Sequence, residues 1–120
     1  MRCEWLEENG LRFLSVDYRG GMSKDEMLAL LEEQVSEVEG VGQGARVLIL
    51  VDPNDRPHPD FLDAVKHAYR ERMDPAGAKV AFVGVSGIGR SVVRGLQLMA
   101  GGLGALAFPS RDKALEYLAR

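Results

Sequence analysis

The sequence contains little that could cross-link the chain or anchor it in a membrane. Cys3 is the single cysteine among 120 residues, so neither an internal disulfide nor a cysteine-based zinc site can form. The first residues are acidic and unlike a signal peptide. No hydrophobic run approaches the ~20 residues that a membrane-spanning helix needs. These absences together predict a cytoplasmic protein without a membrane span.

Excess positive charge is also missing. Lys and Arg number 15 against 18 Asp and Glu, which gives a net charge of −3 and an isoelectric point near 5.4. A nucleic-acid-binding surface needs basic groups that displace counterions from phosphates, so we expect no nucleic-acid partner. The length and the ordinary globular composition predict one domain over residues 1–120.

Short β-type runs alternate with helical stretches along the chain. Asn9-Gly10 separates alternating runs at 2–7 and 11–18 and favours a hairpin, because a type I′ turn needs positive φ at both central positions. Continuous hydrophobic runs are typical of strands covered on both faces. Three further strands are expected at residues 47–51, 80–85 and 105–108.

Capping signals mark the expected helices. Ser23 and Glu26 fit a capping box, and Gly40 is expected to close that helix. Pro59 suits the first position of a second helix, and Ser110 is expected to cap the last one. A third helix is expected between residues 86 and 101. The order is therefore ββαβαβαβα, which predicts an α/β fold with right-handed parallel crossovers and one antiparallel hairpin.

Segments in this order resemble the SpoIIAA-like family of the STAS superfamily, whose better-known members are anti-sigma factor antagonists. The resemblance lies in residues 16–20, 47–52, 80–87, 107–108 and 114–118. It implies a mixed sheet of four to five strands with helices mainly on one face. It also implies a non-enzymatic regulatory module without a cofactor, which binds a protein partner.

The resemblance places partner binding on the loop after the middle strand and on the helix behind that loop. Here the loop is 52–60, and its candidate partner-binding residues are Asp52, Asn54, Asp55, Arg56 and His58. Its position beyond the carboxyl end of a central strand also suits a recognition loop. In the relatives, phosphorylation of a serine at the start of that helix switches partner binding off. Residues 52–60 contain no Ser or Thr, so we do not expect this switch here. The alternative is a solvated crossover held by its prolines.

Residues 84–91 read G-x-x-x-x-G-R-S, one residue away from the phosphate-binding P-loop. Arginine stands where that motif needs lysine, so we do not expect an NTPase. An anion could still bind the free N–H groups at the start of the third helix. The candidate anion-binding residues are Ser86, Gly87, Gly89 and Arg90. The alternative is that the glycines serve tight turning and Ser86 caps the helix.

Other reactive residues give no catalytic or metal-binding pattern. His67 lies four residues from both Asp63 and Glu71, but no third ligand is evident for it or for His58. Cys3 lacks an activating neighbour beyond the adjacent arginine. We therefore expect no metal, no catalytic residue and no enzyme activity.

The expected third helix is hydrophobic around most of its circumference. Arg90 and Arg94 share one face, while Val93, Leu98 and Ala100 widen the hydrophobic part. Such a helix is usually buried more deeply than one sheet face requires. This pattern favours an interface with a protein partner or a homodimer.

Overall fold

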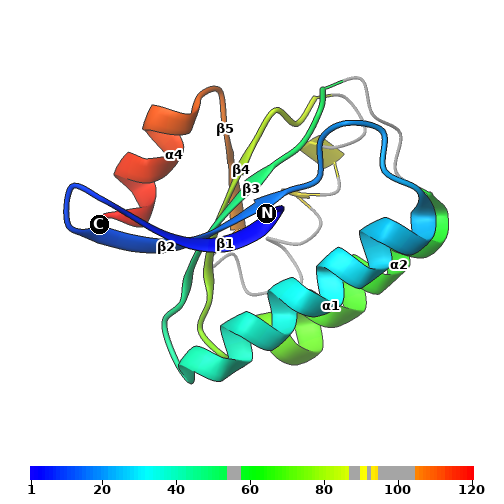
Figure 1. Cartoon of the computed structure of the whole chain (residues 1–120), viewed down its shortest axis with the longest axis horizontal. Coiled ribbons are helices and arrows are strands. Elements are labelled where there is room, and N and C mark those ends of the chain that lie inside the picture. Colours follow the sequence, from blue (N-terminus) through cyan, green and yellow to red (C-terminus); the bar gives the residue numbers. More distant parts are fainter. Residues whose placement is uncertain (54–57, 87–89, 92, 95–104) are drawn as a thin grey trace.

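The computed structural model describes residues 1–53, 58–86, 90–91, 93–94 and 105–120 (Figure 1). None of the described helices is long and hydrophobic enough to cross a membrane. The strands are β1 (Cys3–Glu8), β2 (Leu11–Asp17), β3 (Arg46–Leu50), β4 (Lys79–Val83) and β5 (Ala105–Phe108). The helices are α1 (Lys24–Val41), α2 (Pro59–Ala68), the π-helical turn η1 (Tyr69–Met73) and α4 (Arg111–Leu118).

The strands form one mixed sheet in the order β1-β2-β3-β4-β5, which confirms the expected α/β class. β1 and β2 are antiparallel, and the other neighbouring pairs are parallel. When successive parallel strands are added on the same side of the preceding strand through right-handed crossovers, the helices that connect them lie on the same face of the sheet. Figure 1 shows α1 and α2 on one face and α4 on the other. Among the described helices, α1 and α2 fit the prediction of helices mainly on one face, and α4 does not.

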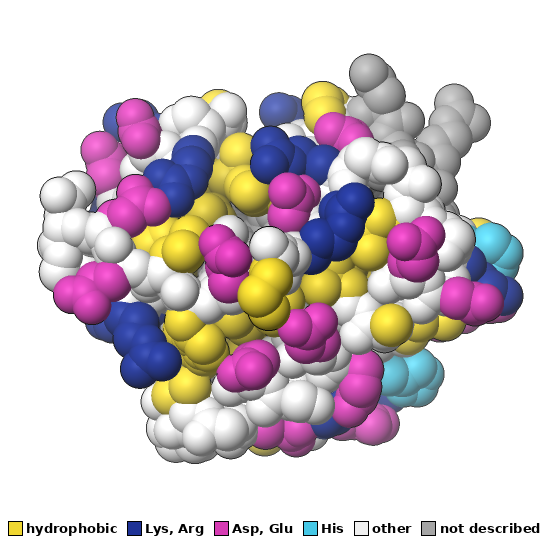
Figure 2. All heavy atoms as spheres, in the orientation of Figure 1, with side chains coloured by type: hydrophobic (Ala, Val, Ile, Leu, Met, Phe, Trp, Pro, Cys, Tyr) yellow, Lys and Arg dark blue, Asp and Glu magenta, His cyan; other side chains and the backbone are white. Residues whose placement is uncertain are grey.

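The hairpin turn is the one expected. Asn9 and Gly10 have φ values of 52° and 80°, as a type I′ turn requires. Trp5 of β1 donates a hydrogen bond from Nε1 to Glu37 Oε2 of α1 at 2.9 Å. Figure 2 shows hydrophobic side chains among charged ones along the seam between β1 and α1. The Trp5 bond therefore fastens the edge strand to the helix that covers it.

Most of the expected helix ends are also confirmed. Ser23 and Glu26 form both halves of the capping box, and Pro59 opens α2. The prediction that Gly40 closes the first helix is wrong, because Gly42 takes the positive φ of 93° at the cap. The N–H of Gly42 donates to the carbonyl of Glu39, which satisfies one of the last carbonyls of the helix.

The second helix ends in a feature that the hydrophobic spacing does not predict. After Ala68 the chain makes a π-helical turn, in which the N–H of Asp74 donates to the carbonyl of Tyr69 at 2.8 Å. The turn buries Tyr69 and Met73 together. It also directs Arg72 to Glu32 on α1, at 2.7 Å between Nη1 and Oε2. The extra residue per turn thus orients the end of this helical segment toward α1.

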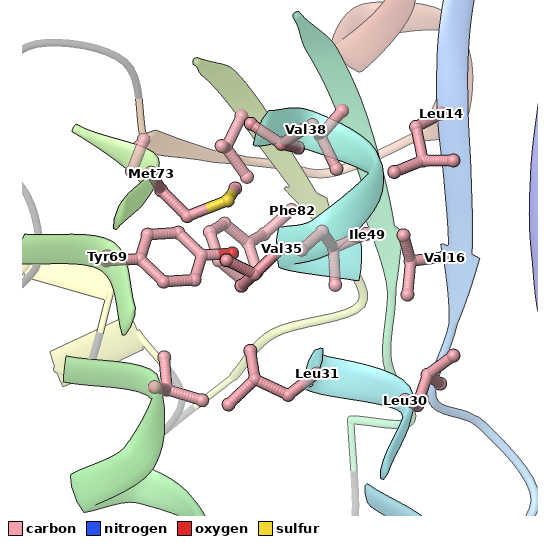
Figure 3. Packing of buried hydrophobic residues seen from close by; sticks show 14 of the residues in the cluster. Leu14, Val16, Leu30, Leu31, Val35, Val38, Ile49, Tyr69, Met73 and Phe82 are labelled. Carbon is pink, nitrogen blue, oxygen red and sulfur yellow. The ribbon is translucent and has the colours of Figure 1, made fainter. Parts of the chain in front are cut away.

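Two hydrophobic cores lie on opposite faces of the sheet. The larger lies between the sheet and the α1–α2 pair, and Figure 3 shows side chains from both meeting there. The smaller joins Phe13, Leu48 and Ala81 to Ala114 and Leu118 of α4. Helices cover both faces of the sheet, which explains why the central strands have unbroken hydrophobic runs.

Cys3 should be protected from thiol reagents in the folded protein. Its side chain is only 5% exposed, and burial raises the pKa of the thiol to about 11. At pH 8 we expect Ellman's reagent to react more than about tenfold faster in urea than in buffer, because the reactive species is the thiolate. Equal rates would contradict this placement.

The same pKa shift predicts a loss of stability in alkali. The unfolded thiol ionises at about pH 8.5, whereas the folded thiol keeps its proton up to about pH 11. Between these values the unfolded chain binds fewer protons, so the free energy of unfolding should fall as pH rises. Urea denaturation of wild type and Cys3→Ala between these two pH values measures this fall in the free energy of unfolding. The fall should be smaller in the variant.

Candidate functional site

The carboxyl ends of the strands are tied together by side-chain contacts with the loops. The Asp52 carboxylate, just after β3, accepts a hydrogen bond from the N–H of Gly20 at 2.9 Å. The Ser86 hydroxyl, just after β4, donates to the carbonyl of Pro53 at 2.7 Å. Three connections of the sheet therefore meet at one edge, where open α/β sheets place their ligands.

A cavity of about 100 Å³ lies beneath this edge, between the sheet and the α1–α2 pair. Its wall is mainly hydrophobic, with side chains from β3, β4, α1 and α2: Ile49, Phe82, Leu31, Phe61 and Val65. Pro53 and Ser86 also line it and are exposed, whereas Asp52 is half-buried. The cavity therefore opens toward the edge at which the loops are joined.

Three polar side chains form a hydrogen-bonded cluster in the wall of this cavity. The Tyr18 hydroxyl donates to Gln34 Oε1 at 2.8 Å, and Gln34 Nε2 donates to the Tyr69 oxygen at 3.2 Å. Gln34 is 0% exposed, and both tyrosines are buried. Burial raises the pKa of Tyr18 and of Tyr69, so both hydroxyls stay protonated. The cluster supplies neutral hydrogen-bonding groups and no charge.

Aromatic packing and the π-helical turn hold the two tyrosines in place. The Tyr18 ring lies 5.5 Å from Phe61, and the Tyr69 ring lies 6.2 Å from Phe82. Figure 3 shows the Tyr69 hydroxyl extending from its helix toward Val35 and Phe82. Our sequence reasoning missed this cluster. The available signal was Gln34, a polar residue within the hydrophobic stripe of the first helix.

The candidate partner-binding residues are brought together only in part. Asp52 contributes to the edge described above, whereas Asn54, Asp55 and Arg56 lie outside the described residues. His58 is exposed and caps α2, because its Nδ1 accepts from the N–H of Asp60 at 3.1 Å. Asp52 and His58 thus have local structural roles in addition to any role in recognition.

The candidate anion-binding residues are likewise only partly described. Gly87 and Gly89 lie outside the described residues, and the Ser86 hydroxyl bonds to Pro53. Arg90 and Arg94 are exposed and line a groove of about 790 Å³ beside the end of β5. The groove thus combines two cationic side chains with a hydrophobic wall that includes Phe108.

Gly84, the first glycine of this motif, has a packing role. Its φ is 95°, and a Cβ atom there would lie 2.0 Å from the carbonyl oxygen of Val51. The first glycine of the motif is therefore explained by the close approach of two backbone segments.

The hydrophobic positions noted in the expected third helix are only partly described. Val93 is buried, whereas Leu98 and Ala100 lie outside the described residues.

The histidines lie apart from any cluster of ligands within the described part of the chain. His67 Nδ1 is 3.8 Å from Glu71 Oε1 on an exposed helix face. No group of three His, Cys, Asp or Glu side chains among the described residues is placed to hold a metal ion. The His67–Glu71 contact is thus a surface pair, whose contribution to stability is small.

Comparison of the chain with protein-family models, curated proteins and solved structures finds no match.

Proposed function

We propose that this chain is a non-enzymatic binding protein that admits a small molecule to the cavity beneath the carboxyl-end edge. The observation that carries the proposal is the cavity itself, a hydrophobic space whose wall carries one polar cluster. An unfilled space of 100 Å³ costs roughly 2 kcal/mol of stability at about 24 cal/mol per Å³. A ligand that fills it recovers part of that free energy.

The character of the cavity supports binding rather than catalysis. General acid–base chemistry needs a group whose pKa lies near the working pH. The hydroxyls of Tyr18 and Tyr69 have pKa values moved further away from neutrality by burial. The resemblance to the SpoIIAA-like family supports a cytoplasmic regulatory role, with occupancy of the cavity as its signal.

Recognition of a protein partner is the second candidate, and the same edge supports it. Pro53, His58, Pro59 and Asp60 are exposed, and Pro53 lines the cavity. These residues belong to the loop and helix that the family resemblance assigns to partner binding.

The anionic-ligand alternative is supported by Arg90 and Arg94, since arginine binds phosphate and carboxylate groups through paired hydrogen bonds.

Filling the cavity tests the ligand proposal. Val65→Phe introduces a larger side chain from α2 into the space, and we expect it to abolish ligand binding. Thermal unfolding would be measured with benzene, small ketones, alcohols and inorganic phosphate. A ligand at 100 times its dissociation constant should stabilise wild type by about 2.7 kcal/mol and Val65→Phe by none of it.

Val41→Phe is the matched control, because Val41 is exposed at the end of α1 and away from the cavity. It should retain the wild-type response. Stabilisation by phosphate that disappears in Arg90→Ala would instead favour the anionic-ligand alternative. No response to any compound would contradict the ligand proposal and leave the protein-partner candidate.

A further inference from the structure

The buried polar cluster has four donor hydrogens, one on each hydroxyl and two on the amide, and its two links use two of them. Two hydroxyls and one amide are joined in a row, so each link uses one donor. Tyr18 donates to the Gln34 carbonyl, and the Gln34 amide donates to Tyr69. The Tyr69 hydroxyl hydrogen has no acceptor among the residues that the structure describes. Because Tyr69 lines the cavity, this donor is available to a molecule within it.

One hydroxyl donor stays unused whichever way the Gln34 amide is oriented. Reversing the Gln34 amide would let Tyr69 donate to its carbonyl and would leave the hydroxyl hydrogen of Tyr18 unused. Tyr18 lines the same cavity. In either arrangement, the hydroxyl of one cavity-lining tyrosine has no acceptor among the described residues, and a buried unsatisfied donor is costly.

The charges around the cavity select against an ionised ligand. Asp52 is the charged side chain among the described lining residues, and its carboxylate would repel an anion. A cation would have to leave water for a mainly hydrophobic wall. The volume equals that of roughly three water molecules at about 30 Å³ each, so only a small molecule or a small end of a larger one fits.

We propose that the cavity takes an uncharged, mainly hydrophobic molecule that carries one hydrogen-bond acceptor, such as a carbonyl oxygen, and that Tyr69 donates to this acceptor. The inference rests on the proposed function and adds the chemical class of the ligand. Gln34 acts as a positioning residue, because it fixes the direction in which the Tyr69 hydroxyl hydrogen points.

A pair of probes of the same shape tests this assignment. 2-Butanone carries the acceptor, and 2-methyl-1-butene replaces the carbonyl oxygen with a methylene group. Binding would be followed by NMR at the Cδ1 methyl group of Ile49, one of two isoleucines and a lining residue. Tyr69→Phe should weaken 2-butanone about five- to tenfold, the worth of one hydrogen bond, and leave the alkene within about twofold.

Tyr117→Phe is the control, because Tyr117 packs against the small core on the opposite face of the sheet. It should leave both affinities unchanged. An effect of Tyr18→Phe in place of Tyr69→Phe would support the site with the amide reversed. If Tyr69→Phe and Tyr18→Phe weaken both probes equally or neither, the donor assignment is wrong and cavity binding stands. If wild type binds neither probe, both proposals fail.

Discussion

Gly84→Ala should destabilise the protein by more than about 3 kcal/mol, the largest effect that we expect from a single methyl group. The residue has a φ of 95°, and strain in this region costs roughly 1–2 kcal/mol for a residue with a Cβ atom. The new Cβ would also lie 2.0 Å from the carbonyl oxygen of Val51. Since both groups are backbone-bound, the chain after β4 must move away from β3.

That movement would disturb the hydrogen bonds between β3 and β4 and the carboxyl-end edge of the sheet above the cavity. The N–H of Val51 donates to the carbonyl of Val83 at 3.0 Å, immediately beside Gly84. The Ser86–Pro53 bond lies two residues further on. We therefore expect Gly84→Ala to lower both the urea midpoint and the affinity for any ligand of the cavity.

Gly21→Ala separates the two causes. Gly21 also has a positive φ, 68°, but an added Cβ there meets nothing within 4 Å. It should lose only the conformational part, about 1 kcal/mol. Similar losses in the two variants would show that the chain near Val51 yields to the methyl group. The contrast would then no longer support close packing as the reason for the glycine.

Local signals explain which parts of the fold could be predicted. The Asn9-Gly10 turn, the Ser23–Glu26 capping box and Pro59 act within a few residues, so their chemistry is legible in sequence. Gly40 and Gly42 compete for the same cap, and the sequence does not decide between them. The π-helical turn depends on contacts with α1, over 30 residues away, and sequence spacing does not show it.

The candidate site shows the same division. Gly84 fits both a phosphate-binding loop and a tight strand end, and only the distance to Val51 supports the second interpretation. The cavity exists because side chains from β3, β4, α1 and α2 leave part of the space between them unfilled, and the sequence does not show how these four elements pack. Gln34 could be noticed as a polar residue in a hydrophobic stripe, but its partners Tyr18 and Tyr69 are 16 and 35 residues away.

Gln34→Leu should reduce the free energy of unfolding by about 2–4 kcal/mol. Leucine occupies a similar volume but leaves the hydroxyls of Tyr18 and Tyr69 without their amide partner in a buried environment. Each unsatisfied buried group costs about 1–3 kcal/mol, which exceeds the gain from the added hydrophobic surface. Urea denaturation measures the loss. Gln43→Leu is the control, since its single bond, to the carbonyl of Pro75, is exposed.

The triple variant Tyr18→Phe, Gln34→Leu, Tyr69→Phe tests the cause of that loss. Replacing all polar partners with hydrophobic groups of similar shape is nearly neutral, so most of the lost stability should return. A triple variant as unstable as Gln34→Leu would place the cause in the shape of leucine. If stability returns while the preference of the cavity for 2-butanone disappears, folding does not require the cluster. Ligand recognition is then the reason that the cluster is there.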